Sequence, residues 1–143
     1  MKELTGDLWS FQETGAWCAI TTNGYVKGDG RCVMGRGVAK EAADRFPEIP
    51  RELGSAILTG GNHVHFLSHN LISFPVKHQW FERADMALIK RSAIELVRHA
   101  TVLRLDAVYL VRPGCGNGHL DWASVKACIE KILDDDRFIV VQR

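Results

Sequence analysis

Two glycine-rich segments, each lying between an apolar run and a helical pattern, constrain this sequence more than any other feature. The first, GYVKGDGRCVMGRG (24–37), follows the apolar run WCAITTN (17–23). The second, GCGNG (114–118), follows DAVYLV (106–111) and precedes DWASVKACIEKIL (121–133). Glycine destabilises regular structure but is favoured where the backbone must approach another group closely. In both loops, backbone N–H groups and a helix N-terminus can point at one anion, so the pair predicts a phosphate cradle built from two sides.

Neither loop matches an established nucleotide-binding fingerprint. GCGNG does not have the spacing G-x-G-x-x-G, and the chain contains no G-x-x-x-x-G-K-[ST]. These mismatches argue against a dinucleotide-type Rossmann unit and against a P-loop kinase.

The pattern along the chain alternates between strands and helices. SAILTG (55–60) and HVHFLSH (63–69), separated by Gly60, Gly61 and Asn62, carry the best hairpin signal. NLISF (70–74) continues the second of these strands or begins another. Further strands are expected at 17–23, 106–111 and 137–141, and helices at 38–46, 84–100 and 121–133, with Asp121 as an N-cap. This order predicts an α/β layered fold, and the length predicts one domain over residues 1–143.

Composition narrows the classes of function. Hydrophobic residues make up 46% of the chain and charged residues 24%, and the formal net charge is +1. A basic surface for bulk nucleic-acid binding is therefore not expected, although a few local cations are compatible with a nucleic-acid substrate. No apolar run has the length of a membrane span, and the first residues lack the apolar core of a secretion signal. We expect a cytoplasmic monomer with no membrane partner, no cofactor, no metal and reduced cysteines.

Lys77 and Asn23 are two polar residues with alternative interpretations. In SFPVKHQW (73–80), Pro75 is expected to end a strand, and Lys77 then projects from a loop either as a solvated side chain or toward a ligand. Asn23 ends the strand 17–23, where its amide suits either a turn or the orientation of a sugar hydroxyl.

Together these motifs resemble a macrodomain, the ADP-ribose-binding fold, over nearly the whole chain. GDL (6–8) resembles the family's first conserved strand end, the stretch 21–47 its first diphosphate loop and helix, and RPGCGNGHLDW (112–122) its second diphosphate loop. FPVKHQW (74–80) resembles the phenylalanine-proline-threonine-lysine motif of the lysine-dependent branch. That branch includes the terminal ADP-ribose protein glycohydrolase and antitoxins that remove ADP-ribose from thymidine in DNA.

The resemblance implies a three-layer α/β/α sandwich around a mixed sheet of roughly six strands, with ADP-ribose in a cleft at the strand ends. It also implies hydrolysis of an ADP-ribosyl linkage on protein or nucleic acid, with Lys77 as the catalytic residue. The ligand-binding residues it implies are Asp7 and Leu8 near the adenine, Asn23 with Thr22 near the distal ribose, and Val33, Met34, Gly35, Arg36, Gly37, Val38, Gly114, Cys115, Gly116, Asn117 and Gly118 around the diphosphate.

The sequence lacks the aspartate that serves as the acid in the eukaryotic glycohydrolase. That enzyme has an aspartate two residues beyond its glycine-cysteine-glycine, where this chain has Gly118. Proton transfer would then fall to His119, Asp121 or a water held by the diphosphate, and Arg36 or His78 would favour a neutral Lys77. A reader that binds ADP-ribose without cleaving it, an ADP-ribose phosphate phosphatase and a small nucleic-acid-binding α/β domain are the alternatives.

Overall fold

The computed structural model describes residues 1–143 and contains six strands and five helices. The strands are β1 (Lys2–Thr5), β2 (Trp17–Asn23), β3 (His65–Phe66), β4 (Leu71–Lys77), β5 (Val108–Leu110) and β6 (Phe138–Gln142). The helices are α1 (Leu8–Glu13), α2 (Gly37–Arg45), α3 (Ile49–Gly60), α4 (Met86–Val102) and α5 (Trp122–Ile129).

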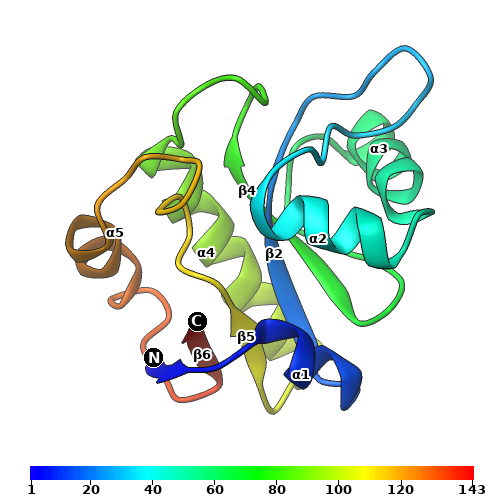
Figure 1. The fold of residues 1–143 in the computed structure, drawn as a ribbon. Coiled ribbons are helices and arrows are strands. Elements are labelled where there is room, and N and C mark those ends of the chain that lie inside the picture. Colours follow the sequence, from blue (N-terminus) through cyan, green and yellow to red (C-terminus); the bar gives the residue numbers. More distant parts are fainter.

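The strands form one mixed sheet in the order β1-β6-β5-β2-β4-β3. Every neighbouring pair is parallel except β3 with β4, which is antiparallel. The carboxyl ends of the five parallel strands therefore meet at one edge of the sheet (Figure 1). In open α/β sheets this edge is where ligands bind.

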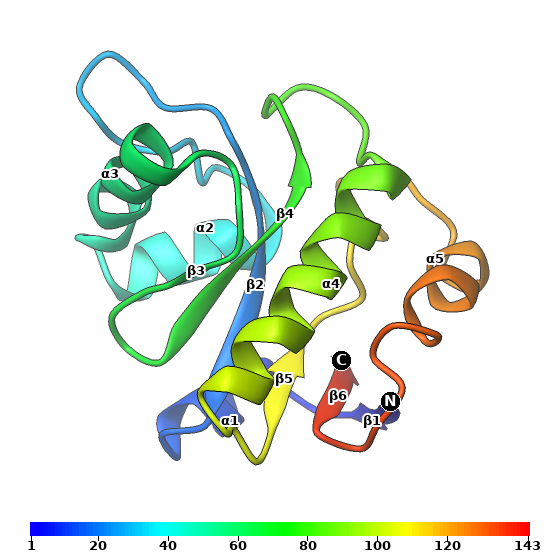
Figure 2. The ribbon, with the colours of Figure 1, turned by 180° about the vertical axis from the view of Figure 1, so that it is seen from behind.

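Helices cover both faces of the sheet, which confirms the predicted three-layer α/β/α sandwich. Along β2, Cys18 and Ile20 pack into one apolar cluster with α1, α2 and α3, whereas Ala19 packs into the other with α4 and α5. This alternation follows from the two-residue period of a strand. Figure 2 shows α4 lying across the sheet on the face opposite to α2 and α3.

The predicted hairpin at 55–69 is wrong, because residues 55–60 form the second half of α3. Ile49 and Leu53 are one helical turn apart and are both completely buried, so the apolar face of a helix outweighs the local turn signal. The glycines end that helix instead: Gly61 has φ +88 and donates its N–H to the Ile57 carbonyl at 2.7 Å.

Pro75 does not end its strand, contrary to the prediction. β4 continues through Pro75 to Lys77, pairing on one side with β2. On its other side the short β3 pairs only with Ile72 and Ser73, so β4 is an edge strand where Pro75 lies. A proline, which lacks an N–H group, is tolerated at such an edge.

The residue pattern did not predict two short elements at the amino end, β1 and α1, although the family resemblance implied the end of a strand at 6–8. None of the five helices is both long and apolar enough to cross a membrane.

Candidate functional site

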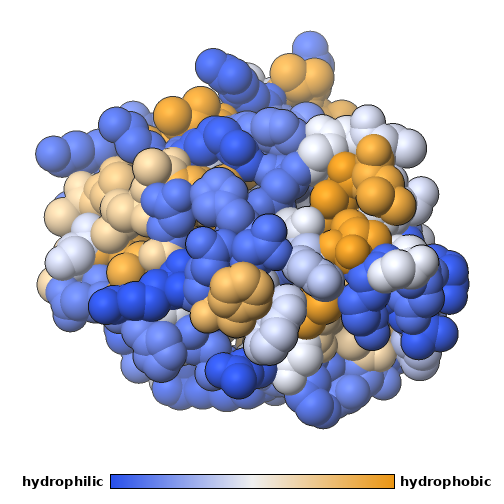
Figure 3. Space-filling view, turned by 90° about the horizontal axis from the view of Figure 1, so that it is seen from above, coloured by the Kyte–Doolittle hydropathy of each residue, from blue (hydrophilic) through white to orange (hydrophobic).

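A cavity of about 1090 Å³ opens at the carboxyl-end edge of the sheet. Both glycine-rich loops line it, together with the ends of β2, β4 and β6. Figure 3 looks onto this side of the molecule and shows apolar surface exposed among predominantly hydrophilic residues. The volume slightly exceeds the usual range of small-molecule pockets, about 300–1000 Å³.

The two loops present free backbone donors. The amide N–H groups of Gly35, Arg36, Gly116, Asn117 and Gly118 donate no hydrogen bond to any protein acceptor. A Cβ atom built on Gly35 or Gly116 would have no neighbour within 4 Å, so space remains beside both loops. The amides of the first loop lie at the N-terminus of α2, and those of the second lie in a turn before α5. Unpaired amides in either setting are suited to holding an anion.

Gly118 is packed too tightly to carry a side chain. A Cβ atom there would lie 2.5 Å from the Gly114 carbonyl oxygen and 2.7 Å from the Ala84 Cβ atom. Gly114 is confined as well, since it has φ +74 and its Cβ atom would lie 2.8 Å from Ile89. The conformation of this loop therefore excludes an aspartate at position 118.

A β-bulge near the end of β4 sets the position of Lys77. Thr22 pairs with Pro75 but the next residue, Asn23, pairs with Lys77, so Val76 is an extra residue in β4. Such a bulge changes the direction of the side chains that follow it. The Lys77 side chain lines the cavity and its Nζ atom donates to the Asn117 carbonyl at 3.1 Å, joining β4 to the second glycine loop.

The surroundings of Lys77 favour its neutral amine. Burial, and then the positive charge of Arg36, hold the pKa of Lys77 below its ordinary value of 10.5. No carboxylate forms an ion pair with Lys77, and Glu41 is the one acidic residue that lines the cavity. A lysine amine with a lowered pKa in a cavity can act as a nucleophile.

Solved structures with a similar fold were found by comparison. The macrodomain of Thermus aquaticus DarG superposes with a TM-score of 0.78 at 24% identity, covering 99% of this chain and 97% of that chain. The Mycobacterium tuberculosis DarG macrodomain gives the same values. Thermosipho africanus DarTG in complex with ADP-ribose superposes with a TM-score of 0.75 at 18% identity, covering 100% of this chain and 42% of that one. The chain has the macrodomain fold.

Curated relatives of this chain carry an activity in their names. A DNA ADP-ribosyl glycohydrolase of Mycobacterium tuberculosis is 29% identical over an alignment of 105 residues, and the match covers 66% of this chain and 30% of the relative. A DNA ADP-ribosyl glycohydrolase of Thermus aquaticus is 27% identical over an alignment of 112 residues, and the match covers 71% of this chain and 31% of the relative. The chain thus spans less than a third of the length of these relatives. No protein-family model matches it.

The structure brings almost all of the residues expected at the site together. Those that line the cavity are Leu8, Thr22, Asn23, Val33, Met34, Gly35, Arg36, Gly37, Val38, Lys77, Gly114, Cys115, Gly116, Asn117 and Gly118. Their contacts with ADP-ribose remain predictions. Asp7 is the exception, since its carboxylate caps α1 through the Trp9 N–H at 3.2 Å and pairs with Arg143 at 3.3 Å.

Asn23 holds the first loop in place. Its Nδ2 group donates to the Val33 carbonyl at 2.9 Å, and its Oδ1 atom accepts from the Tyr25 N–H at 2.9 Å. The side chain therefore makes the contacts of a turn residue while also lining the cavity. Nδ2 carries a second hydrogen that these contacts do not use.

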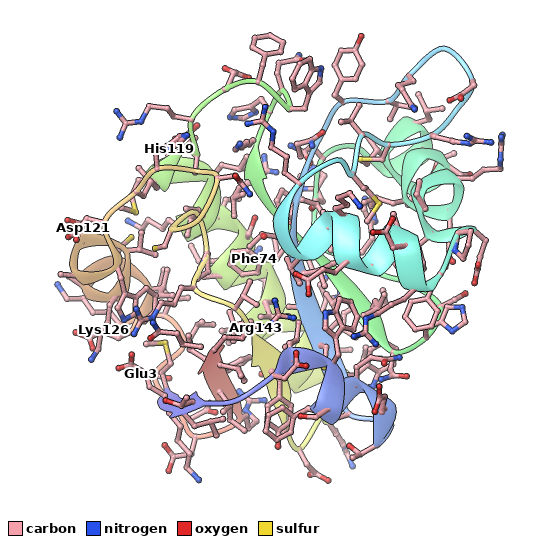
Figure 4. All side chains as sticks on the ribbon, viewed as in Figure 1. Glu3, Phe74, His119, Asp121, Lys126 and Arg143 are labelled. Atoms are coloured by element: carbon pink, nitrogen blue, oxygen red, sulfur yellow. The ribbon has the colours of Figure 1, made fainter.

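Sequence analysis did not find Trp9, Glu41 and Arg143, which line the cavity at the end of β6. Glu41 accepts hydrogen bonds from Trp9 Nε1 at 3.0 Å and from the Arg143 guanidinium. Figure 4 shows Arg143 between β6 and the helices α1 and α2. The three residues are far apart in the sequence, and no spacing rule connects them before the sheet order is known.

The two side chains considered for proton transfer do not reach this cavity. Asp121 caps α5 by accepting from the Ser124 N–H at 3.1 Å, as predicted, and the exposed His119 lies on the same outer loop. Figure 4 shows Asp121 at the start of α5 and His119 higher up, on the loop that leads to it over the upper end of α4. His78 is also engaged elsewhere, since its Nε2 atom lies 2.9 Å from Asp85 Oδ2. Of the proposed partners, Arg36 is the one whose charge acts on Lys77.

Proposed function

We propose that this macrodomain binds ADP-ribose and hydrolyses an ADP-ribosyl linkage, with Lys77 as its catalytic residue. The observation that carries the proposal is the position of the Lys77 amine in the same cavity as the free amides of both glycine loops. Those amides are suited to a diphosphate. The curated relatives named DNA ADP-ribosyl glycohydrolase, although longer, support the same activity.

The chemistry follows from a neutral lysine. The Lys77 nitrogen attacks C1 of the ring-opened distal ribose, and a carbon–nitrogen bond forms. The bond from C1 to the acceptor breaks, and the acceptor leaves with a proton. One water then adds to the imine carbon and supplies the oxygen of the released ADP-ribose, while the carbon–nitrogen bond breaks and returns the amine.

The proton must come from a group other than the acid of the eukaryotic enzyme. Position 118 has no room for a carboxylate, and Glu41 is paired with Arg143 and Trp9. A water held at the diphosphate meets the need without any further side chain. General acid–base help is worth about 10²- to 10⁴-fold, so we expect a slow enzyme.

Trapping the imine tests this proposal. The protein is incubated with ADP-ribose and borohydride, which reduces an imine to a stable amine, and its intact mass is measured. We expect one adduct in the wild type and none in Lys77→Ala. Lys27→Ala is the matched control, because Lys27 lines the same cavity and its loss should leave the adduct unchanged.

The same experiment separates a hydrolase from a reader. If calorimetry shows ADP-ribose binding but no adduct forms at Lys77, the catalytic role of the lysine is wrong and a reader is favoured. If ADP-ribose does not bind, the whole proposal is wrong.

We further propose that the acceptor is a nucleobase of DNA. Three aromatic side chains are exposed near the end of β4: Tyr25 (38%), Trp80 (43%) and Phe81 (66%). Tyr25 and Trp80 line the cavity, and the rings of Trp80 and Phe81 meet edge to face with centroids 5.5 Å apart. Exposed aromatic rings stack on unpaired bases, which favours a nucleic acid over a protein side chain.

A further inference from the structure

Four consecutive carbonyl groups at the end of β4 are held by different partners. The Pro75 carbonyl accepts from the Ser92 hydroxyl at 2.7 Å, and the Val76 carbonyl accepts from the Asp85 N–H at 2.8 Å. The His78 carbonyl accepts from the Gly24 N–H at 3.2 Å. The carbonyl of Lys77 itself accepts from the side-chain amide of Asn62, whose Nδ2 atom lies 3.1 Å away.

Asn62 belongs to the short connection between α3 and β3, which α4 holds in place. The Asn62 carbonyl accepts from the Arg91 guanidinium, and the Arg91 Nε atom lies 3.5 Å from Glu95 Oε2. Glu95 also accepts from the Val64 N–H at 2.9 Å, two residues after Asn62. One helix therefore anchors the backbone at Asn62 and just after it.

The first glycine loop closes over the Asn62 amide from the opposite side. A Cβ atom on Gly24 would lie 2.7 Å from both Cγ and Nδ2 of Asn62. Only a glycine at position 24 allows the chain leaving β2 to approach this amide so closely. Because Gly24 also donates its N–H to the His78 carbonyl, the packing links β2, Asn62 and the segment after Lys77.

We propose that Asn62 is a positioning residue for Lys77, fixing the Lys77 peptide beside the β-bulge and so the direction in which the amine enters the cavity. This inference rests on the proposed function, since it assumes that Lys77 reacts. Asn62 itself does not line the cavity, so it acts through the lysine and makes no contact with the ligand. Misplacing a reacting group by about 1 Å costs on the order of a hundredfold in rate.

The test compares Asn62→Ala with a matched asparagine at the other end of the same strand. Asn70 precedes β4, and its Nδ2 group also holds backbone carbonyls, those of Gln12 at 3.0 Å and Ala16 at 2.6 Å. Asn70→Ala should therefore lower the melting temperature at least as much, without changing the trapping of ADP-ribose on Lys77.

For Asn62→Ala we expect imine trapping and kcat to fall about tenfold to a hundredfold. The dissociation constant of ADP-ribose and KM should stay close to the wild-type values. Gly24→Ala should reproduce the fall in kcat, because its methyl group displaces the Asn62 amide without removing it. A variant that is merely less stable would have a lower melting temperature, but it would not combine a lowered kcat with an unchanged KM.

Two results would overturn the inference. In the first, Asn62→Ala traps ADP-ribose and turns over as fast as the wild type while Lys77→Ala is inactive. This result rejects the positioning role of Asn62 but leaves the proposed function intact. The other is an equal loss of kcat in Asn70→Ala, which attributes the effect to general destabilisation. If the wild type itself forms no adduct, Lys77 is not reactive and both proposals fail.

Discussion

The amine of Lys77 experiences two effects in the same direction, burial in the cavity and the positive charge of Arg36. Both lower the pKa of the amine from its ordinary value of 10.5, so a larger neutral fraction exists near neutral pH. The motif FPVKHQW alone does not contain Arg36, which reaches the lysine from a different loop. Sequence analysis offered Arg36 and His78 as the cation beside Lys77, and of these two Arg36 is the one whose charge acts on it.

We expect the rate of imine trapping to rise with pH as Lys77 loses its proton, with a midpoint below 10.5. Arg36→Ala removes the nearby cation, so the pKa of Lys77 rises and the midpoint moves to higher pH. Arg31→Ala is the control: Arg31 lines the cavity but is not among the charges that lower this pKa. Trapping rates at a series of pH values measure the midpoint, and an unchanged midpoint in Arg36→Ala contradicts the electrostatic argument.

At the scale of elements, the long and periodic segments were predictable and the short ones were not. The spacing of apolar residues in α4 predicts that helix closely, because a continuous buried face runs along it. α1 has six residues and β1 has four, too few for a period to emerge. α3 was mistaken for a strand since Gly60, Gly61 and Asn62 suit a hairpin turn as well as a helix end.

Replacing Leu53 tests the packing of α3 against the sheet. Leu53 is completely buried, so Leu53→Ala should lower the free energy of unfolding by about 2–5 kcal/mol. Leu58, on the same helix, is 69% exposed, and Leu58→Ala should change the free energy of unfolding by less than about 0.5 kcal/mol. Urea denaturation followed by circular dichroism measures both. Equal effects of the two substitutions would contradict the helix described for residues 49–60.

For the whole molecule, the near-zero net charge restricts how it recognises a polyanion. A formal charge of +1 gives the protein almost no net positive field, and the cations at the cavity include Lys27, Arg31 and Arg36. The composition predicted this restriction, whereas the order of the strand and helix patterns predicted the fold class. The grouping of exposed aromatic rings beside those cations depends on the sheet order and was not predicted.

An oligonucleotide carrying ADP-ribose on a base tests the proposed acceptor. Trp80→Ala should lower kcat/KM about tenfold, since stacking of one base contributes about 1–3 kcal/mol, while binding of free ADP-ribose stays unchanged. If Lys27, Arg31 and Arg36 each contact one phosphate of a single strand, the slope of log affinity against log salt concentration should be about −2. Val102→Ala, an exposed apolar position on α4, serves as the control. An equal loss of activity on an ADP-ribosylated protein would argue against a nucleobase.

The pairing of β1 with β6 has a practical consequence for using this domain as a reagent. Lys2 pairs with Ile139 and Thr5 with Gln142, so the two strands run side by side in the same direction. Arg143 consequently lies at the cavity, whereas Met1 lies at the opposite end of the strand pair. A fluorophore joined after Arg143 would report directly on filling of the cavity. An affinity tag or surface tether is better joined before Met1, where it leaves the ligand's entrance free.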